Sequence, residues 1–113
     1  MSWYVSESVK RSFENRIQKT LELIYQSGIN FIEIGVFGSY ARQDYKATSD
    51  IDFCVIVEKH PERSVSGNLR MDAKEIGADI VYATPAYFNN DTSHFAKNLR
   101  KDYRRIDAQR NIL

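Results

Sequence analysis

The stretch Gly38–Glu58, GSYARQDYKATSDIDFCVIVE, joins a small-residue turn and a polar loop to an aliphatic run that contains acidic residues. Within it, Ile51–Val57 (IDFCVIV) is rich in β-branched and aromatic side chains, which predicts a buried strand. An isolated carboxylate in such a strand would cost several kcal/mol to bury. Asp50 and Asp52 therefore need water, a paired cation or a bound metal ion.

The two aspartates are spaced so that they can act together. Successive side chains of a strand point to opposite faces, so Asp50 and Asp52 share a face, with α-carbons roughly 6.5 Å apart. Mg²⁺ prefers oxygen ligands and is usually held by one or two carboxylates together with substrate phosphates and water. Asp79 directly precedes another apolar strand, predicted over Ile80–Ala83, and is expected to complete a three-carboxylate cluster. Taken alone, an Asp-x-Asp pair is a weak signal, because strand-end aspartates also cap neighbouring turns.

A glycine and a serine stand at the other end of the quoted stretch. Gly38 and Ser39 follow the predicted strand Phe31–Phe37 and open a single helical turn over Tyr40–Gln43. A glycine lets a ligand approach the backbone, a serine offers a hydroxyl, and the free amides of a helix N-terminus can bind phosphate. This arrangement predicts a phosphate site beside the carboxylates, although a plain turn would show the same two residues.

The remaining pattern predicts an α/β (α+β) fold, with a small mixed β-sheet flanked by helices, in a single domain that spans all 113 residues. Apolar residues at four- and three-residue steps predict an amphipathic helix over Ser6–Ser27, which Gly28 ends. A weaker pattern predicts a second helix over Arg63–Glu75. A last helix is expected after a cap at Asp91 or Thr92. Its apolar face would carry Phe95, Leu99, Tyr103 and Ile106.

Composition limits the classes of partner and compartment. Sixteen basic and fifteen acidic residues give a net charge of +1, so there is no general basic field for nucleic acid, and such a partner is not expected. The single cysteine, Cys54, cannot form an internal disulfide and is expected in the core. No apolar run has the length of a signal peptide or membrane span, which predicts a cytoplasmic protein. His60 and His94 lack the spacing of a zinc site.

The combination of Gly-Ser, ten residues and Asp-x-Asp, followed by a third strand-borne aspartate, resembles the DNA-polymerase-β-like nucleotidyltransferase superfamily. In particular, it resembles the minimal nucleotidyltransferases (MNT), which have one domain. The resemblance implies that Gly38 and Ser39 bind the triphosphate of ATP or another NTP. It also implies that Asp50 and Asp52 hold two Mg²⁺ ions, and that Asp79 completes the metal site and helps to deprotonate the acceptor hydroxyl.

Arg42 matches the arginine of the Ala-Arg-Gly wording that is usual in this superfamily. The resemblance implies that Arg42 supports the phosphate loop as a nucleotide-binding residue, with a structural or solvated salt bridge as the alternative. Gln43 stands where the family usually has glycine, which leaves the geometry of this turn open.

The resemblance implies a Mg²⁺-dependent transfer of a nucleoside monophosphate, AMP from ATP in the favoured interpretation, to an acceptor hydroxyl. Relatives of this size resemble the nucleotidyltransferase half of two-protein HEPN/MNT systems, in which it acts as an antitoxin by adenylylating a helical HEPN-type partner. That is the function expected here, and a homo-oligomer is also possible. The alternatives are transfer to a small molecule such as an aminoglycoside, or a non-catalytic module that binds a nucleotide or a partner.

Overall fold

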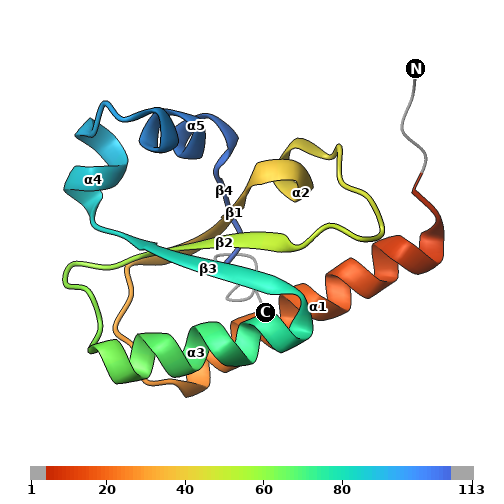
Figure 1. Cartoon of the computed structure of the whole chain (residues 1–113), viewed down its shortest axis with the longest axis horizontal. Helices are drawn as coiled ribbons and strands as arrows, with labels where there is room; N and C mark the ends of the chain where they lie inside the picture. Colours follow the sequence, from red (N-terminus) through yellow and green to blue (C-terminus); the bar gives the residue numbers. More distant parts are fainter. Residues whose placement is uncertain (1–4, 108–113) are drawn as a thin grey trace.

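A four-stranded mixed β-sheet forms the centre of the computed structural model, which describes residues 5–107 (Figure 1). The strands are β1 (Glu33–Phe37), β2 (Ile51–Ile56), β3 (Ala78–Ala83) and β4 (Arg104–Arg105). They lie in the order β3-β2-β1-β4. β1 runs antiparallel to β2 and to β4, whereas β2 and β3 are parallel. The predicted mixed sheet is confirmed, and β4 is a strand that the sequence pattern did not predict.

Helices lie on both sides of this sheet (Figure 1). α1 (Glu7–Gln26) and α3 (Arg63–Ile76) cover one face. α2 (Gly38–Arg42), α4 (Pro85–Asn90) and α5 (His94–Asp102) lie on the other side. Within residues 5–107, no helix combines the length and the apolar character that a membrane crossing requires.

The alternation of side chains along β2 separates two apolar clusters. Phe53 and Val55 are fully buried in the larger cluster, between the sheet and the pair α1 and α3. Cys54 and Ile56 point to the opposite face and pack in a smaller cluster with Leu99 of α5. Burial raises the pKa of the Cys54 thiol to about 12, as expected for a core residue. The second face therefore has the thinner cover, and its uncovered part is where a site can form.

The first helix follows its sequence pattern closely. Ser6 caps α1, and its hydroxyl accepts a hydrogen bond from the Val9 amide at 3.3 Å. At the other end Ser27 is the C-terminal cap, and Gly28 follows in a left-handed conformation with φ +78°. A left-handed residue after the last turn satisfies free carbonyls there, and glycine adopts this conformation at low cost. The predicted start and end of this helix are confirmed.

The C-terminal region differs from the prediction at the start of its helix. α5 is capped by Ser93, whose hydroxyl accepts a hydrogen bond from the Ala96 amide at 3.2 Å, so the predicted cap at Asp91 or Thr92 is wrong. The residues before it form α4, a short helix that begins with Pro85 and was not predicted. Proline is favourable in a first turn, where its missing amide has no partner to lose, but six residues are too few for a helical period.

The last helix also ends earlier than predicted. α5 stops at Asp102, so Tyr103 and Ile106 do not extend its apolar face. The chain instead forms β4, which pairs with the middle of β1, and the Tyr103 hydroxyl donates a hydrogen bond to Glu33 Oε2 at 2.7 Å. Without β4 this side of β1 would present unpaired backbone groups. The contact joins residues 70 positions apart, which a helical periodicity cannot register.

Gly35 marks the place where β1 has no room for a side chain. A Cβ at this position would overlap the Tyr103 ring and lie 2.7 Å from the Arg104 carbonyl oxygen. Gly35→Ala should therefore lower the free energy of unfolding by about 2–3 kcal/mol, as overpacking a well-packed core does. Urea denaturation measures this change. Gly67→Ala on α3 is the matched control, because a Cβ there meets nothing within 4 Å, and it should not destabilise the protein. Wild-type stability of Gly35→Ala would contradict the packing described.

Candidate active site

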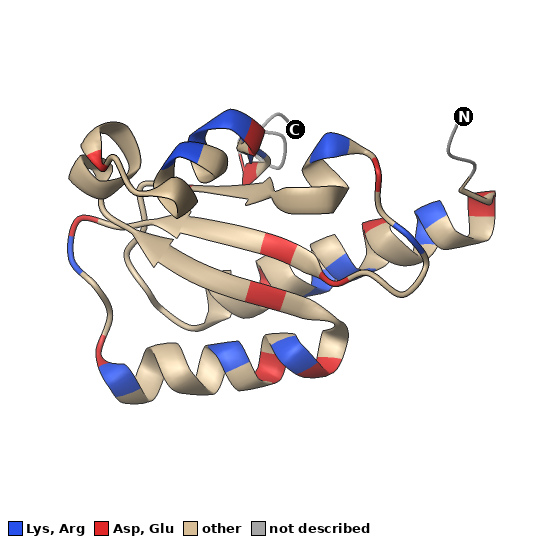
Figure 2. Cartoon of the chain, turned by 45° about the horizontal axis from the view of Figure 1, so that its top comes forward, with Lys and Arg blue, Asp and Glu red and all other residues tan. Residues whose placement is uncertain are grey.

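Three aspartates lie together at one end of the two parallel strands. In the β2 and β3 ladder Asp52 is directly opposite Asp79, so both side chains point to the same, thinly covered face. β3 begins at Ala78 rather than at Ile80, which makes Asp79 a strand residue. Asp50 comes immediately before β2. Figure 2 shows acidic positions side by side on these neighbouring strands. The structure thus brings together the three carboxylates that the sequence analysis selected.

The environment of Asp52 shows how concentrated the negative charge is. Partial burial raises the pKa of the Asp52 carboxyl above its usual value, and repulsion from Asp79 and Asp50 raises it further. Attraction to Arg42 and Lys74 acts in the opposite direction but does not cancel these effects. A site that disfavours its own negative charge in this way favours a bound cation.

Lys74 is a member of this group that the sequence analysis missed. Its ammonium lies 3.9 Å from Asp50 Oδ2 and 3.9 Å from Asp79 Oδ2. It comes from the last turn of α3, immediately upstream of β3. In the sequence it is one of several charged residues on the exposed side of an amphipathic helix, so nothing distinguishes it before the helix is placed against the strands.

The donor chemistry of the cluster suits Mg²⁺, since carboxylate oxygens are the protein ligands that this ion prefers. With the side chains as they stand, no three His, Cys, Asp or Glu residues within 5–107 are arranged to hold a metal ion. Lys74 supplies a positive charge next to two of the three carboxylates. Asp50, Asp52 and Asp79 are the residues that fit the predicted metal site, and their role as ligands stays a prediction.

Gly38 allows the Asp52 carboxylate to lie directly against the backbone at the start of α2. Gly38 has φ +74°, and a Cβ on this residue would overlap Asp52 Oδ2. The glycine is therefore required twice, by the left-handed conformation and by the contact. Ser39 follows as the second residue of α2, so the single helical turn predicted over Tyr40–Gln43 is present, but it begins at Gly38 and ends at Arg42. Nucleotide binding by Gly38 and Ser39 stays a prediction, and its place would be next to Asp52.

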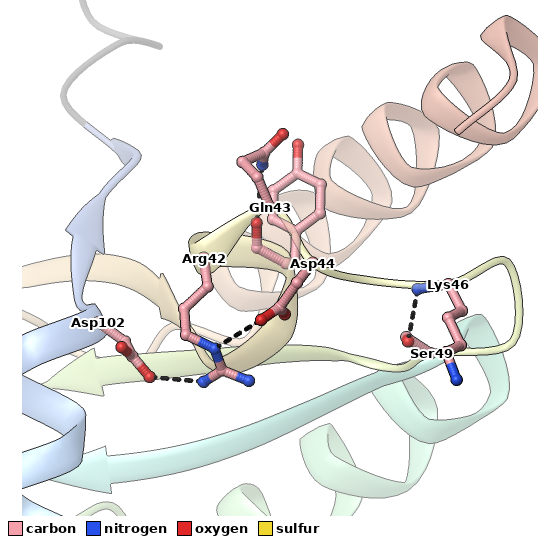
Figure 3. Close-up of polar contacts among 7 residues, drawn as sticks. Arg42, Gln43, Asp44, Lys46, Ser49 and Asp102 are labelled. Carbon is pink, nitrogen blue, oxygen red and sulfur yellow. Dashed lines mark hydrogen bonds and ion pairs between the residues drawn. The ribbon is translucent and has the colours of Figure 1, made fainter. Parts of the chain in front are cut away.

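Arg42 connects α2 to α5 (Figure 3). Its guanidinium donates to Asp44 Oδ2 at 3.2 Å and to Asp102 Oδ2 at 2.8 Å. The Asp102 side chain is 11% exposed and the Arg42 side chain is 48% exposed, so only the carboxylate of this second pair is enclosed. Of the two roles considered for Arg42, the structural salt bridge is present in the structure, and the nucleotide-binding role stays a prediction.

Gln43 has a backbone conformation that favours glycine, the residue that is usual at its position. It adopts the left-handed conformation with φ +66°, which costs a residue with a side chain about 1–2 kcal/mol. Its own side chain offsets part of this cost, because Nε2 donates to the Tyr40 carbonyl at 2.7 Å. The turn therefore keeps a glycine-like geometry with glutamine in place.

The loop between α2 and β2 is fixed immediately before the aspartates. The Lys46 amide donates to Ser49 Oγ at 2.9 Å (Figure 3), and the Ser49 amide donates back to the Lys46 carbonyl at 2.9 Å. From α1, the Arg16 guanidinium donates to the Ser49 carbonyl at 3.1 Å. Since Ser49 precedes Asp50, these bonds set the direction in which the chain enters the site. Neither contact was predicted from the sequence.

Solved structures share this fold. A chain of a putative nucleotidyltransferase from Sulfolobus solfataricus is 23% identical, with a TM-score of 0.55, over 92% of this chain and 90% of that one. A toxin–antitoxin complex with AMP-PNP matches at 16% identity and TM-score 0.57, over 88% and 78% of the two chains. A complex of the tri-AMPylated Shewanella oneidensis HEPN toxin with its MNT antitoxin matches at 14% and 0.54, over 81% and 69%. At these identities the likeness establishes the fold.

The family comparison covers most of the chain. The model of the family described as nucleotidyltransferase domain matches residues 10–110, a range that contains all of the candidate site residues. The comparison with curated proteins gave no match. The enzyme class implied by the Gly-Ser and Asp-x-Asp pattern is thereby confirmed. The chain belongs to the nucleotidyltransferase domain family.

Proposed function

We propose that this chain transfers AMP from ATP to a hydroxyl group of a HEPN-type partner protein, in a reaction that requires Mg²⁺. The observation that carries this proposal is the meeting of Asp50, Asp52 and Asp79 beside Gly38, where Asp52 touches the start of α2. A carboxylate cluster next to a bare backbone turn suits a site for a metal-bound triphosphate.

The residues divide the work of the reaction between them. The acceptor oxygen attacks the α-phosphorus, the bond to the pyrophosphate oxygen breaks, and the Asp79 carboxylate takes the proton of the hydroxyl. Gly38 lets the triphosphate approach the backbone, and the Ser39 hydroxyl donates to a phosphate oxygen. Asp50, Asp52 and Asp79 would hold two Mg²⁺ ions, which when bound neutralise the charge on the phosphate oxygens and the leaving group. Orientation and charge stabilisation account for most of the rate of such a transfer.

The choice of acceptor rests on the proteins that share the fold. Among them are a HEPN toxin described as tri-AMPylated in complex with an MNT antitoxin and a toxin–antitoxin complex with AMP-PNP. Their identity to this chain is 14–16%, so the partner is part of the proposal and is tested directly.

The test is transfer of label from ATP carrying a radioactive α-phosphate. Wild-type protein, Mg²⁺ and lysate of the source cell should give a labelled band that mass spectrometry identifies as a HEPN-type protein carrying AMP on a hydroxyl side chain. Asp50→Asn should give no band, because one carboxylate of the cluster is lost. Asp72→Asn removes an exposed carboxylate from α3 outside the cluster and should label as the wild type does.

Other results would overturn specific parts of the proposal. Equal labelling by Asp50→Asn and the wild type would show that the aspartates do not take part in the reaction. A labelled small molecule with no labelled protein would show that the acceptor is a small molecule and not a partner protein. Binding of ATP without transfer to any component would indicate the non-catalytic module instead.

A further inference from the structure

Lys74 has a position that the transfer reaction described above does not use. Its ammonium is equidistant, at 3.9 Å, from one oxygen of Asp50 and one oxygen of Asp79. These two carboxylates belong to different strand ends, and Lys74 belongs to a third element, α3. The Lys74 ammonium therefore lies close to two carboxylates of the candidate metal site that come from different strands or their ends.

The Lys74 side chain is exposed enough to move away from the two carboxylates. Its side chain is 62% exposed, and those of Asp50 and Asp79 are 51% and 42% exposed. Ion pairs with this exposure hold their partners weakly, and a lysine side chain can swing into solvent on a flexible stem. The pair of Arg42 with Asp102 differs, because its N–O distance is 2.8 Å and the Asp102 side chain is only 11% exposed.

A metal ion bound to these carboxylates and the ammonium would compete for the same negative charge. Mg²⁺ binds carboxylate oxygens at about 2.0–2.1 Å and keeps water or phosphate in its remaining positions. A protonated amine has no lone pair with which to coordinate the metal, and its charge repels the ion. A divalent cation bound to both Asp50 and Asp79 would therefore be repelled by the nearby Lys74 ammonium and would favour its movement into solvent.

We infer that Lys74 is a tethered counter-ion that occupies the metal position between Asp50 and Asp79 and competes with Mg²⁺ for these carboxylates. The inference rests on the proposed function, since it assumes that the cluster binds metal. Lys74 then has two effects on the site. It neutralises mutual repulsion of the carboxylates in the metal-free protein, and it raises the Mg²⁺ concentration at which the site fills. Lys74 thus sets how readily the metal site fills and takes no part in the bond-making step.

The test is a Mg²⁺ titration followed by melting temperature in 150 mM KCl, without nucleotide or partner, so that it does not depend on activity. At this ionic strength the screening length is about 8 Å, so distant charges contribute little. Lys74→Gln should reach half of its Mg²⁺-dependent shift in melting temperature at a Mg²⁺ concentration at least about threefold lower than the wild type needs. A residue with a purely structural role would change the melting temperature but leave this midpoint unchanged.

Two matched variants isolate the contact from the general charge. Arg70→Gln removes a positive charge from the same helix, one turn earlier and away from the ion pairs that Asp50 and Asp79 form with Lys74, and its midpoint should stay within about twofold of the wild type. Lys74→Arg keeps the charge at the site and should also stay close to the wild type. A lower midpoint in Lys74→Gln alone supports the inference.

The remaining outcomes separate failure of this inference from failure of the proposed function. If the wild type shows a Mg²⁺-dependent shift that Asp52→Asn lacks, but Lys74→Gln has an unchanged or higher midpoint, Lys74 does not compete and only the inference is overturned. If Arg70→Gln lowers the midpoint as much as Lys74→Gln does, the effect is general charge and the inference is again overturned. If the wild type shows no Mg²⁺-dependent shift, the metal site itself fails, and with it both the proposed mechanism and the role of Lys74.

Discussion

Asp52→Asn should abolish nucleotidyl transfer and at the same time raise the melting temperature of the metal-free protein. Asp52 is half-buried against Gly38 and repelled by Asp79 and Asp50, so its charge costs stability in the absence of metal. The amide has nearly the same shape and lacks the charge. Transfer should fall by at least about a thousandfold, since metal ions supply several kcal/mol of charge stabilisation in such reactions and about 1.4 kcal/mol is tenfold in rate.

The opposite directions of these two effects make the prediction specific. Melting in EDTA should show Asp52→Asn a few degrees above the wild type at neutral pH. Because folding raises the pKa of Asp52, the folded state favours the protonated carboxyl over the charged one. The contribution of this group to stability is therefore present below the unfolded pKa of about 3.9, and it is lost as the pH rises through the pKa of the folded state. The advantage of the variant should therefore shrink as the pH is lowered towards about 4. Loss of activity together with a lower melting temperature would mean that Asp52 has a structural role instead.

Gly38→Ala should reduce transfer by about a hundredfold, because the added methyl group displaces the Asp52 carboxylate or the start of α2. A displacement of about 1 Å is enough for such a loss in a reaction that depends on orientation. The left-handed conformation at φ +74° adds a penalty of about 1–2 kcal/mol in the free energy of unfolding. Steady-state transfer and urea denaturation measure the two effects separately.

Gly28→Ala provides the matched control for this variant. Gly28 has nearly the same conformation, with φ +78°, but a Cβ there meets nothing within 4 Å. Both variants should lose a similar amount of stability from the backbone, and only Gly38→Ala should lose activity. If both retain wild-type transfer at a temperature where they are folded, the contact between Gly38 and Asp52 does not matter for the reaction.

These predictions depend on features that differ in how far they could be read from the sequence. Local patterns were sufficient for α1, because its apolar period, its Ser6 cap and Gly28 all lie within the helix or next to it. The period of two along a strand was likewise sufficient to place Asp50 and Asp52 on one face. The turn at Gly38 followed from its position directly after an apolar strand.

Features that depend on distant contacts could not be predicted in this way. The sequence pattern extended the last helix to Ile106, whereas in the structure the helix ends at Asp102 and the chain then pairs with β1 as the strand β4. The pairing partners are far apart in the chain, and tertiary contacts outweigh local helical preference where they satisfy an open strand edge. Arg42 is a similar case, since its partner Asp102 lies 60 positions away.

The sequence by itself was enough to predict which carboxylates come together, because the Asp-x-Asp spacing and a third aspartate before an apolar run depend only on strand periodicity and order along the chain. The tertiary structure decided what surrounds them: the parallel register that sets Asp52 opposite Asp79, the contact of Gly38 with Asp52, and the ammonium of Lys74 between Asp50 and Asp79. The physical reason is that a periodic pattern reports the direction of a side chain relative to its own element. Distances between elements are set only when helices and strands pack together.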